Sequence, residues 1–342
     1  MADAICTPTK FETRSAIIQA YAKETTRNSK PVDGTKFALL PTSSDSSVPS
    51  FVPTKLELNE INPDRMKRSS KDSISSLSWD TSSELSISKT LPDLIAAMFL
   101  TTSDGKEVFM PSKPGDMTTF SYMVYKPNVK QSQLLMGSIP KSIVMTFQEG
   151  AYSKLDISWG ASREVAEFDV DQPFETEELP ASPAVATHEI QEILINDQPV
   201  AFYSKGITIT LDAGAQESVL IKGVSLSYGQ VSVMLSGRIL LSDCNDMQRY
   251  AIEKTPVKID VKIIEPQSGN EMTFNMPNAT IGQVSISSES NNIFTDFTAE
   301  GIFNAKGKTD KEKSVCSLEF VLNESATRLV ESVPANEKTE EA

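Results

Sequence analysis

Few residues in this chain have the types and spacing that catalysis or metal binding requires. His188 is the only histidine, so metal sites and mechanisms that need two histidines are excluded within one chain, and an ordinary surface histidine is the simpler interpretation. Asp169 and Asp171 have the spacing of a calcium-loop fragment. The glycine and distal glutamate of such a loop do not follow, so a solvated acidic loop explains these aspartates better.

Other signatures of chemistry do not occur in the sequence. It contains no glycine-rich phosphate loop, no nucleophile elbow and no Cys-x-x-Cys pair. Carboxylates are numerous enough for a glycosidase pair, yet nothing singles out two of them. We therefore predict no catalytic residue, no cofactor and no metal ion.

The charge balance argues against a surface that grips nucleic acid. The 342 residues include 32 basic and 46 acidic side chains, a formal net charge of −14. DNA binding depends on cations that neutralise phosphates, whereas a surface that stays near DNA without adhering to it would carry this sign. With 39% hydrophobic residues, the chain can bury the core of two ordinary domains or of one large β unit.

Cysteine use and hydropathy favour synthesis in a cytoplasm. Cys6, Cys244 and Cys316 are odd in number and far apart, which fits reduced thiols better than a disulfide framework. No apolar run approaches the roughly 20 residues of a membrane helix, and the first residues lack the pattern of a signal peptide. We expect no association with a membrane.

Polar stretches separate the chain into parts. Between Glu164 and Ser204 there are ten acidic residues and no lysine or arginine, and prolines punctuate the stretch, which is typical of a linker or exposed loop. The predicted parts are an N-terminal arm with extended loops (1–54), a first folded unit (55–163), the acidic linker or loop (164–198), a second folded unit (199–325) and a flexible acidic tail (326–342).

Strands are predicted from apolar and polar residues that alternate. In "SIVMTF" (142–147) and again in "KLDISW" (154–159), every second residue is apolar, which puts one face in a core and the other in solvent. Gly150 lies between the two stretches. The sequence therefore predicts a half-buried hairpin with Gly150 in its turn.

The two folded units resemble each other in order and spacing. Each has a strand pair followed by a short helix, "TLPDLIAAMFL" (90–100) in the first unit and "CNDMQRYAIEK" (244–254) in the second, and then further strands. Pro140 aligns with Pro277 at the entry to one of these strands. We interpret the pattern as a duplicated β-rich unit with one helix per copy. A chance match of generic strands is the alternative.

A particular succession of elements runs from Lys55 to Ala305. It begins with a strand, an acidic and arginine segment, a polar strand and a leucine-rich helix, in "LELNEINPDRMKRSSKDSISSLSWDTSSELSISKTLPDLIAAMFL". It continues through the strand "FSYMVY" and the hairpin, and returns as "ITITLDAGAQESVLIKGVSLSYGQVSVMLSGRILLS". This succession resembles the tail tube (major tail) protein of long, non-contractile-tailed bacteriophages, the siphophages. No single motif is diagnostic, because the family is recognised by strand order and patterning.

The resemblance implies a structural, non-enzymatic protein of mainly β fold, whose sandwich or barrel units each carry one short α-helix. Sheets of several subunits would join into a β-barrel around a lumen, and the rings would stack helically into a tube for genome ejection. If each chain supplies two tube units, a ring of six-fold appearance needs three chains. If only one unit lines the bore, it needs six.

The resemblance also implies partners and a location. The partners are further copies of the chain, the tape measure protein and double-stranded DNA within the lumen, and tail tip and terminator proteins at the ends of the tube. The location is the virion tail, assembled in the cytoplasm of the host bacterium.

On such a barrel, the polar partners of the alternating apolar residues would face the lumen. Acidic groups there would repel phosphates over about 8–10 Å at physiological salt, so DNA would slide past them. The candidate lumen residues are Glu84, Ser86, Asp156, Ser158, Asp260 and Asp296.

Two further groups of residues are candidates for contacts between subunits or rings. The cations of "DRMKRSSK" allow a phosphate grip or a solvated face, and in an assembly they could meet the acidic loop of a neighbour. The long loop 101–116 has an apolar tip that suits a dock onto the adjacent ring, and packing back on its own subunit suits it equally. The candidates are Arg65, Lys67, Arg68 and Lys71, with Glu175, Glu177 and Glu178 opposite them, and Val108, Phe109 and Met110 at the loop tip.

Two other classes of protein are weighed against a tube protein. A baseplate or adhesin-type β-barrel would be a binding module that forms discrete particles with affinity for a glycan or receptor. A carbohydrate-active enzyme would turn over polysaccharide. A tube protein is distinguished from both by rings or filaments that form as its concentration rises.

Overall fold

The computed structural model is mainly β and describes residues 17–32, 34–43, 46–47, 49, 54–57, 70–73, 77–103, 106–168, 175–176, 184–200, 204–220, 223–241 and 247–323. The strands are β1 (Ile18–Lys23), β2 (Lys36–Leu39), β3 (Thr54–Glu57), β4 (Ser70–Ser73), β5 (Leu77–Glu84), β6 (Glu107–Phe109), β7 (Phe120–Lys126), β8 (Gln131–Gln148), β9 (Lys154–Ala161), β10 (Arg163–Phe168), β11 (Glu175–Thr176), β12 (Ile190–Ile195), β13 (Gln198–Pro199), β14 (Ser204–Asp212), β15 (Gln216–Leu220), β16 (Gly223–Ser227), β17 (Ser232–Leu240), β18 (Val257–Ile264), β19 (Glu271–Glu289), β20 (Asn292–Gly301) and β21 (Ser317–Val321). The helical segments are α1 (Thr90–Met98), the 3-10 turn η2 (Thr187–Glu189), α2 (Met247–Glu253) and α3 (Asp310–Lys313).

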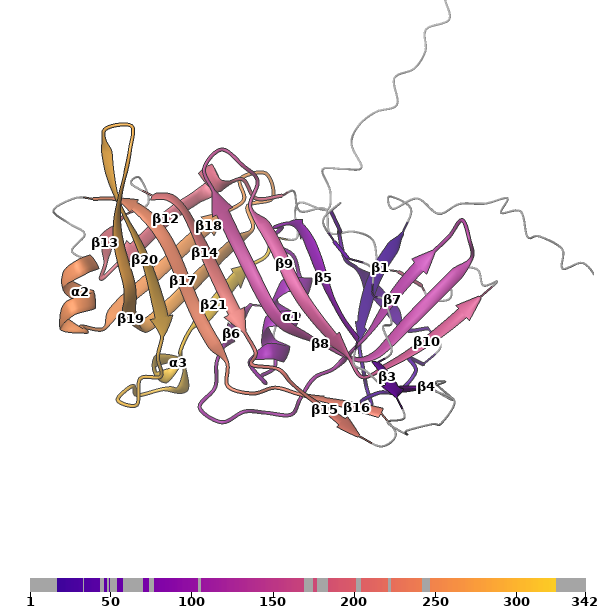
Figure 1. The fold of residues 1–342 in the computed structure, drawn as a ribbon. Helices are drawn as coiled ribbons and strands as arrows, with labels where there is room; N and C mark the ends of the chain where they lie inside the picture. Colours follow the sequence, from indigo (N-terminus) through magenta and orange to yellow (C-terminus); the bar gives the residue numbers. More distant parts are fainter. Residues whose placement is uncertain are drawn as a thin grey trace, which may run out of the picture.

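Seven strands form one layer, which we call the front sheet. Their order is β5, β9, β8, β14, β17, β20 and β19, and each strand is antiparallel to the next (Figure 1). The predicted hairpin is confirmed as β8 and β9, and Gly150 occupies its turn with a φ of 72°, a backbone conformation that suits glycine.

The second layer lies behind the front sheet in two parts. In the first unit, β1 pairs with β2 and β7, and β7 and β10 flank the N-terminal half of β8. In the second unit, β12, β18, the N-terminal half of β19, β21 and β6 follow one another. The long strands β8 and β19 therefore belong to both layers, and a register shift interrupts each of them where the pairing partner changes.

The two halves of the chain follow the same scheme of strand pairing. In the first, β7, β8 and β9 are consecutive neighbours and β5 pairs with β9; in the second, β18, β19 and β20 are consecutive neighbours and β17 pairs with β20. The helices α1 and α2 occupy the same place in this order, at the positions predicted from the sequence. The described strands do not close into a barrel within one chain.

Both ends of the segment 164–198 are strands, where the sequence analysis expects a linker. Strand β10 pairs with β8, and β12 pairs with β18, so these ends belong to the sheets of the two units. In β12, Ile193 and Ile195 are each 3% exposed, whereas the preceding Glu192 is exposed. The acidic composition of the segment therefore concealed the alternate apolar positions of this strand.

The hydrophobic core lies between the layers and is aromatic in the first unit. Trp79 and Trp159 are directly opposed on β5 and β9, with ring planes 4° apart and centroids 6.1 Å apart. The ring centroids of Tyr122 and Trp159 are 5.2 Å apart. The indole N–H of Trp159 donates to Thr81 Oγ1 at 3.0 Å. These stacked and tilted rings join both layers of the unit.

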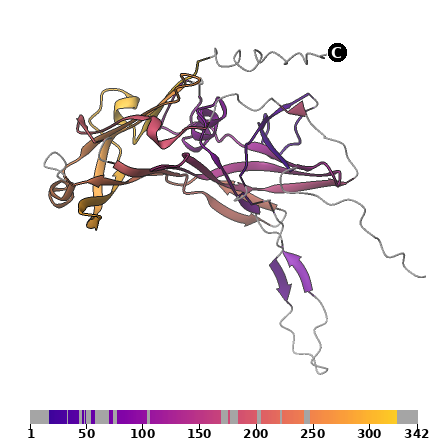
Figure 2. The ribbon, with the colours of Figure 1, turned by 90° about the horizontal axis from the view of Figure 1, so that it is seen from above.

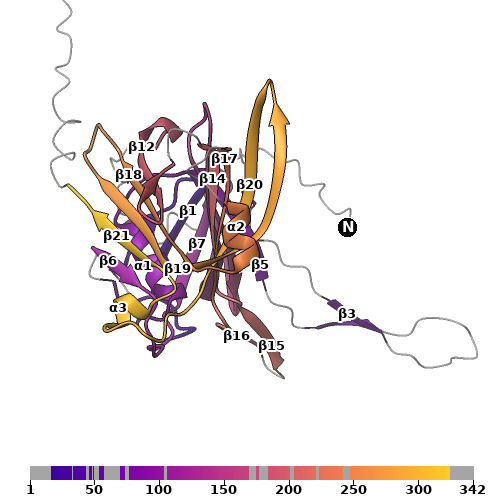
Figure 3. The ribbon, with the colours of Figure 1, turned by 90° about the vertical axis from the view of Figure 1, so that its left-hand side faces the viewer.

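Two short hairpins extend beyond the sandwich. The β3–β4 hairpin projects away from the body of the molecule (Figures 2 and 3). The β15–β16 hairpin extends from the second unit beyond the end of the front sheet (Figure 1). Its residues Val224 and Leu226 pack on Ile139 of the first unit. Lys141 also forms an ion pair with Glu217 of this hairpin at 3.4 Å.

Candidate functional site

Most side chains that point outward from the front sheet are polar, although Val144 and Met234 also lie on this face. On β9, Leu155, Ile157 and Trp159 are buried, so the residues between them point outward. The same alternation holds on β8, β14 and β17. The described outward residues include Asp80, Ser82, Glu84, Ser142, Thr146, Lys154, Asp156, Ser158, Thr208, Thr210, Asp212, Ser236, Arg238, Ser285, Ser287, Asp296, Thr298 and Glu300.

Pairing registers bring small hydroxyl side chains of several strands into line. Thr146 of β8 is opposite Thr208 of β14, which is opposite Ser236 of β17, which is opposite Thr298 of β20. A shallow hollow in the surface lies over these four residues. Because these side chains are short, they protrude little from the sheet. They carry no charge that could hold a polyanion.

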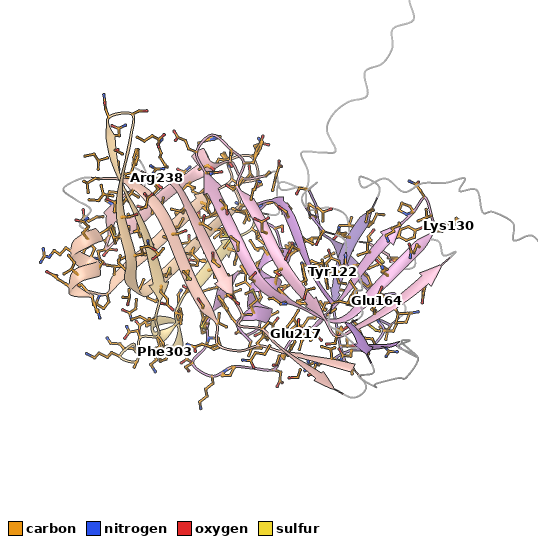
Figure 4. The ribbon with its side chains drawn as sticks, in the orientation of Figure 1. Tyr122, Lys130, Glu164, Glu217, Arg238 and Phe303 are labelled. Atoms are coloured by element: carbon orange, nitrogen blue, oxygen red, sulfur yellow. The ribbon has the colours of Figure 1, made fainter. Side chains whose placement is uncertain are left out.

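Two of the cations near this surface are paired with carboxylates. Lys205 Nζ lies 2.7 Å from Glu289 Oε1, and Arg238 lies 3.5 Å from both Glu289 and Asp296. The hydrogen bond and charge of Lys205 lower the pKa of the exposed Glu289 carboxyl. Lys205 and Arg238 also sit over the ring of Phe294, at 5.1 and 5.0 Å from its centroid. Arg238 is labelled on the second unit in Figure 4.

Four of the predicted lumen residues lie together on this face. Glu84, Asp156, Ser158 and Asp296 all point outward from the front sheet, and Asp156 and Asp296 occupy corresponding places in the two units. Ser86 lies two residues beyond the end of β5 and is half buried.

Asp260 lies on a different surface. It belongs to β18 in the second layer, where Ile259 and Val261 face the core, so its side chain points away from the front sheet. Lys258 Nζ lies 2.7 Å from Asp260 Oδ2, and this contact raises the pKa of Lys258. Asp260 therefore does not share a surface with Asp156 and Asp296. Alternation identified its outward direction but could not tell to which layer its strand belongs.

Most of the charged contact candidates fall outside the part of the chain that the structure describes. Arg65, Lys67, Arg68, Glu177 and Glu178 are among these, and the contact predicted for them stays a prediction. Lys71 lies on β4 opposite Leu56, and Glu175 begins β11 opposite Lys36 of the parallel strand β2.

The apolar loop tip packs against its own chain. Val108 lies in β6, which pairs with β21 of the second unit, and its side chain is 1% exposed. Phe109 and Met110 are half buried beside it. This is the alternative in which the loop packs back on its own subunit, and the buried Val108 is not available to an adjacent ring.

The described residues offer little for chemistry. No group of three or more histidine, cysteine or acidic residues in the described ranges could hold a metal ion, and no helix among them is long and apolar enough to cross a bilayer. His188 is exposed on η2, as expected of a surface histidine. Burial raises the pKa of the Cys316 thiol, because the thiolate would be desolvated.

The class of protein follows from the comparison of the sequence with family models. Residues 15–301 match the model of the phage tail tube protein family, and the chain belongs to that family. It is therefore a structural component of a bacteriophage tail. None of the curated proteins compared with the chain is similar to it.

Proposed function

We propose that this protein assembles into rings, and that stacked rings form the tail tube of a siphophage through which the genome is ejected. The front sheets of neighbouring copies would continue into one another as a closed barrel, with the outer polar face lining the channel. One observation carries the proposal. The front sheet runs without interruption through both units and presents a single hydroxyl-rich and acidic face.

The strand count supports a ring of three copies. Each chain offers the seven strands of the front sheet, so three chains supply 21, and the stretch at Ser43 and Ser47, which bonds to the outer edge of β5, would bring the number to 24 by acting as an eighth strand of each chain in the ring. With strands about 4.8 Å apart and tilted by about 40°, 24 strands enclose a backbone diameter of about 48 Å.

This diameter suits the passage of a duplex. After about 5 Å of side chain on each side, the bore would be about 38 Å, which clears a hydrated duplex about 20 Å wide. Two chains supply 16 strands and leave a bore of only about 22 Å by the same estimate. A hexamer in which only one unit lines the bore is the alternative to the trimer.

The charge of the face suits a conduit for DNA. Asp80, Glu84, Asp156, Asp212 and Glu300 give the described face a net excess of carboxylates. Lys205 and Arg238 add little attraction for phosphate, because Glu289 and Asp296 neutralise them. Repulsion screened over about 8 Å would keep the polyanion away from the wall while it slides.

The remaining partners follow from the same proposal. The tape measure protein and DNA would occupy the lumen in turn, tail tip and terminator proteins would bind the two ends, and assembly would take place in the host cytoplasm. Contacts between rings would include the cations at Arg65, Lys67, Arg68 and Lys71 and the carboxylates at Glu175, Glu177 and Glu178 of a neighbour, which would steer association.

Electron microscopy of the purified full-length chain tests the proposal. At rising concentration we expect rings of six-fold appearance and then tubes, with a single ring of about 112 kDa for three chains of 37.4 kDa each. Discrete monomers at every concentration would refute a tube protein. Monomers that bind a glycan or receptor would favour an adhesin-type module instead.

A further inference from the structure

The front sheet contains a seam where the first unit meets the second. Strand β8 of the first unit pairs with β14 of the second from Ser142–Asp212 to Gln148–Gly206. Met145 and Phe147 of β8 and Ile209 of β14 are all 0% exposed. Helix α1 lies at the same seam, against β8 and β6, and its side chains Leu94 and Ile95 are also buried.

The second unit has the same elements, but its seam is open. The C-terminal half of β19 corresponds to the half of β8 at the seam, because it pairs with β20 as β8 pairs with β9. Asp156 is opposite Val144, and its counterpart Asp296 is opposite Ser285, so Met145 corresponds to Ile286 and Thr146 to Ser287. Among the described strands, only β20 pairs with β19 beyond Ile281.

Apolar residues at this open end are exposed where their counterparts are buried. Ile286 is 52% exposed, whereas Met145 is fully buried. Ile252 of α2 is 82% exposed, whereas most side chains of α1 are buried. Exposed apolar side chains beside an unpaired strand edge are costly for a lone molecule and favour the addition of another chain.

The opposite end of the front sheet carries the matching edge. In the second unit, β14 lies along β17, and the β15–β16 hairpin separates the two strands in sequence. In the first unit, Ser43 and Ser47 lie along β5, donating their backbone N–H groups to Ser82 and Asp80 at 2.7 and 2.8 Å, and the β3–β4 hairpin comes between. This stretch therefore lies along the edge of β5 as β14 lies along β17, but it is not a strand, because Ser47 is four residues from Ser43 where Asp80 is two residues from Ser82.

The registers identify the residues that would meet. Asp80 is opposite Ser158 as Ser236 is opposite Thr298, so Asp80 corresponds to Ser236. The backbone N–H of Ser47 donates to the carbonyl of Asp80, and the backbone N–H of Asp80 donates to Ser47 Oγ. Because Thr208 is opposite Ser236, Ser47 corresponds to Thr208.

We propose that the open end of β19 and α2 receives the β5 end of a second copy of the chain, in the register of the internal seam. Ser287 then lies beside Ser47 of the next copy as Thr146 lies beside Thr208 within one chain. The contact is head to tail, so repeating it closes a ring when the rotation permits. This inference rests on the proposed self-assembly and specifies its partner edges.

The seam between copies would be smaller than the seam within a chain. After α1, the chain extends into β6, which pairs with β21 across the internal seam. After α2, only three residues precede β18, so no corresponding strand can be contributed. Unassembled chains would therefore keep their two units joined while their ends stay available.

Thiol cross-linking tests the register. In a background with Cys6→Ser and Cys244→Ser, the double variant Ser47→Cys, Ser287→Cys is assembled and treated with a short bismaleimide, then separated by denaturing electrophoresis. We expect bands of two and three chains, with trimer as the largest product if three copies close the ring. The variant Thr146→Cys, Thr208→Cys is the positive control and should cross-link only within a chain.

The single-cysteine variants Ser47→Cys and Ser287→Cys are the matched negative controls. A head-to-tail seam brings unlike positions together, so neither variant alone should give dimers. Rings seen by microscopy without cross-linking of the double variant would overturn this seam and leave the tube function standing. Efficient dimers from either single variant would overturn the head-to-tail arrangement. Chains that form no rings at any concentration would refute the proposed function itself, and the seam with it.

Discussion

Replacing Ile286 by alanine should weaken assembly while leaving the free chain nearly as stable as before. Complete burial of an isoleucine side chain contributes about 1.5–3 kcal/mol, and Ile286 is already about half buried in the single chain. The seam would bury the other half, which contributes about 1 kcal/mol per contact. That energy corresponds to about a fivefold change in each association constant, or about a hundredfold over three contacts in a ring.

Substitution of Met145, the counterpart of Ile286, should instead destabilise the free chain. Met145 is fully buried beneath the internal seam, so Met145→Ala should lower the free energy of unfolding by about 2–5 kcal/mol. Urea unfolding of dilute, unassembled protein measures the loss of stability in each variant. Sedimentation at rising protein concentration measures the loss of assembly. Ile286→Val is the conservative control and should assemble almost as the parent does.

The reasoning would be refuted by an inverted pattern. If Ile286→Ala destabilised the dilute chain as strongly as Met145→Ala and left the assembly midpoint unchanged, then Ile286 would serve only the core of its own unit. Equal assembly of Ile286→Ala and Ile286→Val, with both as stable as the parent, would likewise show that no contact covers this side chain.

Three further outcomes are expected. Trp159→Ala should lower the free energy of unfolding by about 3–5 kcal/mol in urea titration, because it removes the fully buried centre of the aromatic cluster, whereas Trp159→Phe should cost less. Cys316 should resist maleimide in the folded protein and react after denaturation, since burial raises its pKa; rapid labelling of the native protein would contradict this. The folded-state pKa of Glu289 is lowered by Lys205, so its stabilising effect should be fully present above the ordinary glutamate pKa of about 4.3 and should be lost as the pH falls from there through the lower folded-state pKa. The difference in melting temperature between the parent and Glu289→Gln should follow that course, and a constant difference from pH 7 to 3 would count against it.

The strands were predictable where one face is buried. In β9 and β14, apolar residues such as Ile157 and Ile209 alternate with polar ones, and period two is a local property of the chain. In β12, Ile193 and Ile195 also occupy alternate positions, but the ten acidic residues between Glu164 and Ser204 are the stronger signal in the composition and predict a linker. A count of apolar residues at alternate positions around Ile193 would have found it.

The partners of each strand could not be read from local pattern. Asp260 and Asp296 each lie between buried residues of an alternating strand. Asp260 nevertheless belongs to the second layer and Asp296 to the front sheet, because the layer of a strand depends on pairing across the whole chain. The pairing of β6 with β21 is equally remote in sequence, so the choice between Val108 on a docking loop and Val108 in a core was open. The paired cations Lys205 and Arg238 were missed for the same reason, since their carboxylates lie on other strands.

Differences between the closed and the open seam suggest how the chain avoids uncontrolled association before a ring forms. At the internal seam, β8 contributes Ile143, Met145 and Phe147 to the core, and by register the positions on β19 are Val284, Ile286 and Ser288. Serine in place of phenylalanine, and Glu289 at the end of the strand, make the free edge more polar than its buried counterpart. Polar and charged residues on an edge strand discourage indiscriminate pairing with other sheets. An edge that is only partly apolar needs a matching register, and the contacts at α2, to bind a second copy well.

Ser288→Phe should therefore promote association of the dilute chain into irregular aggregates as well as rings, visible by light scattering and microscopy. Unchanged light scattering with normal rings would show that this position does not limit association.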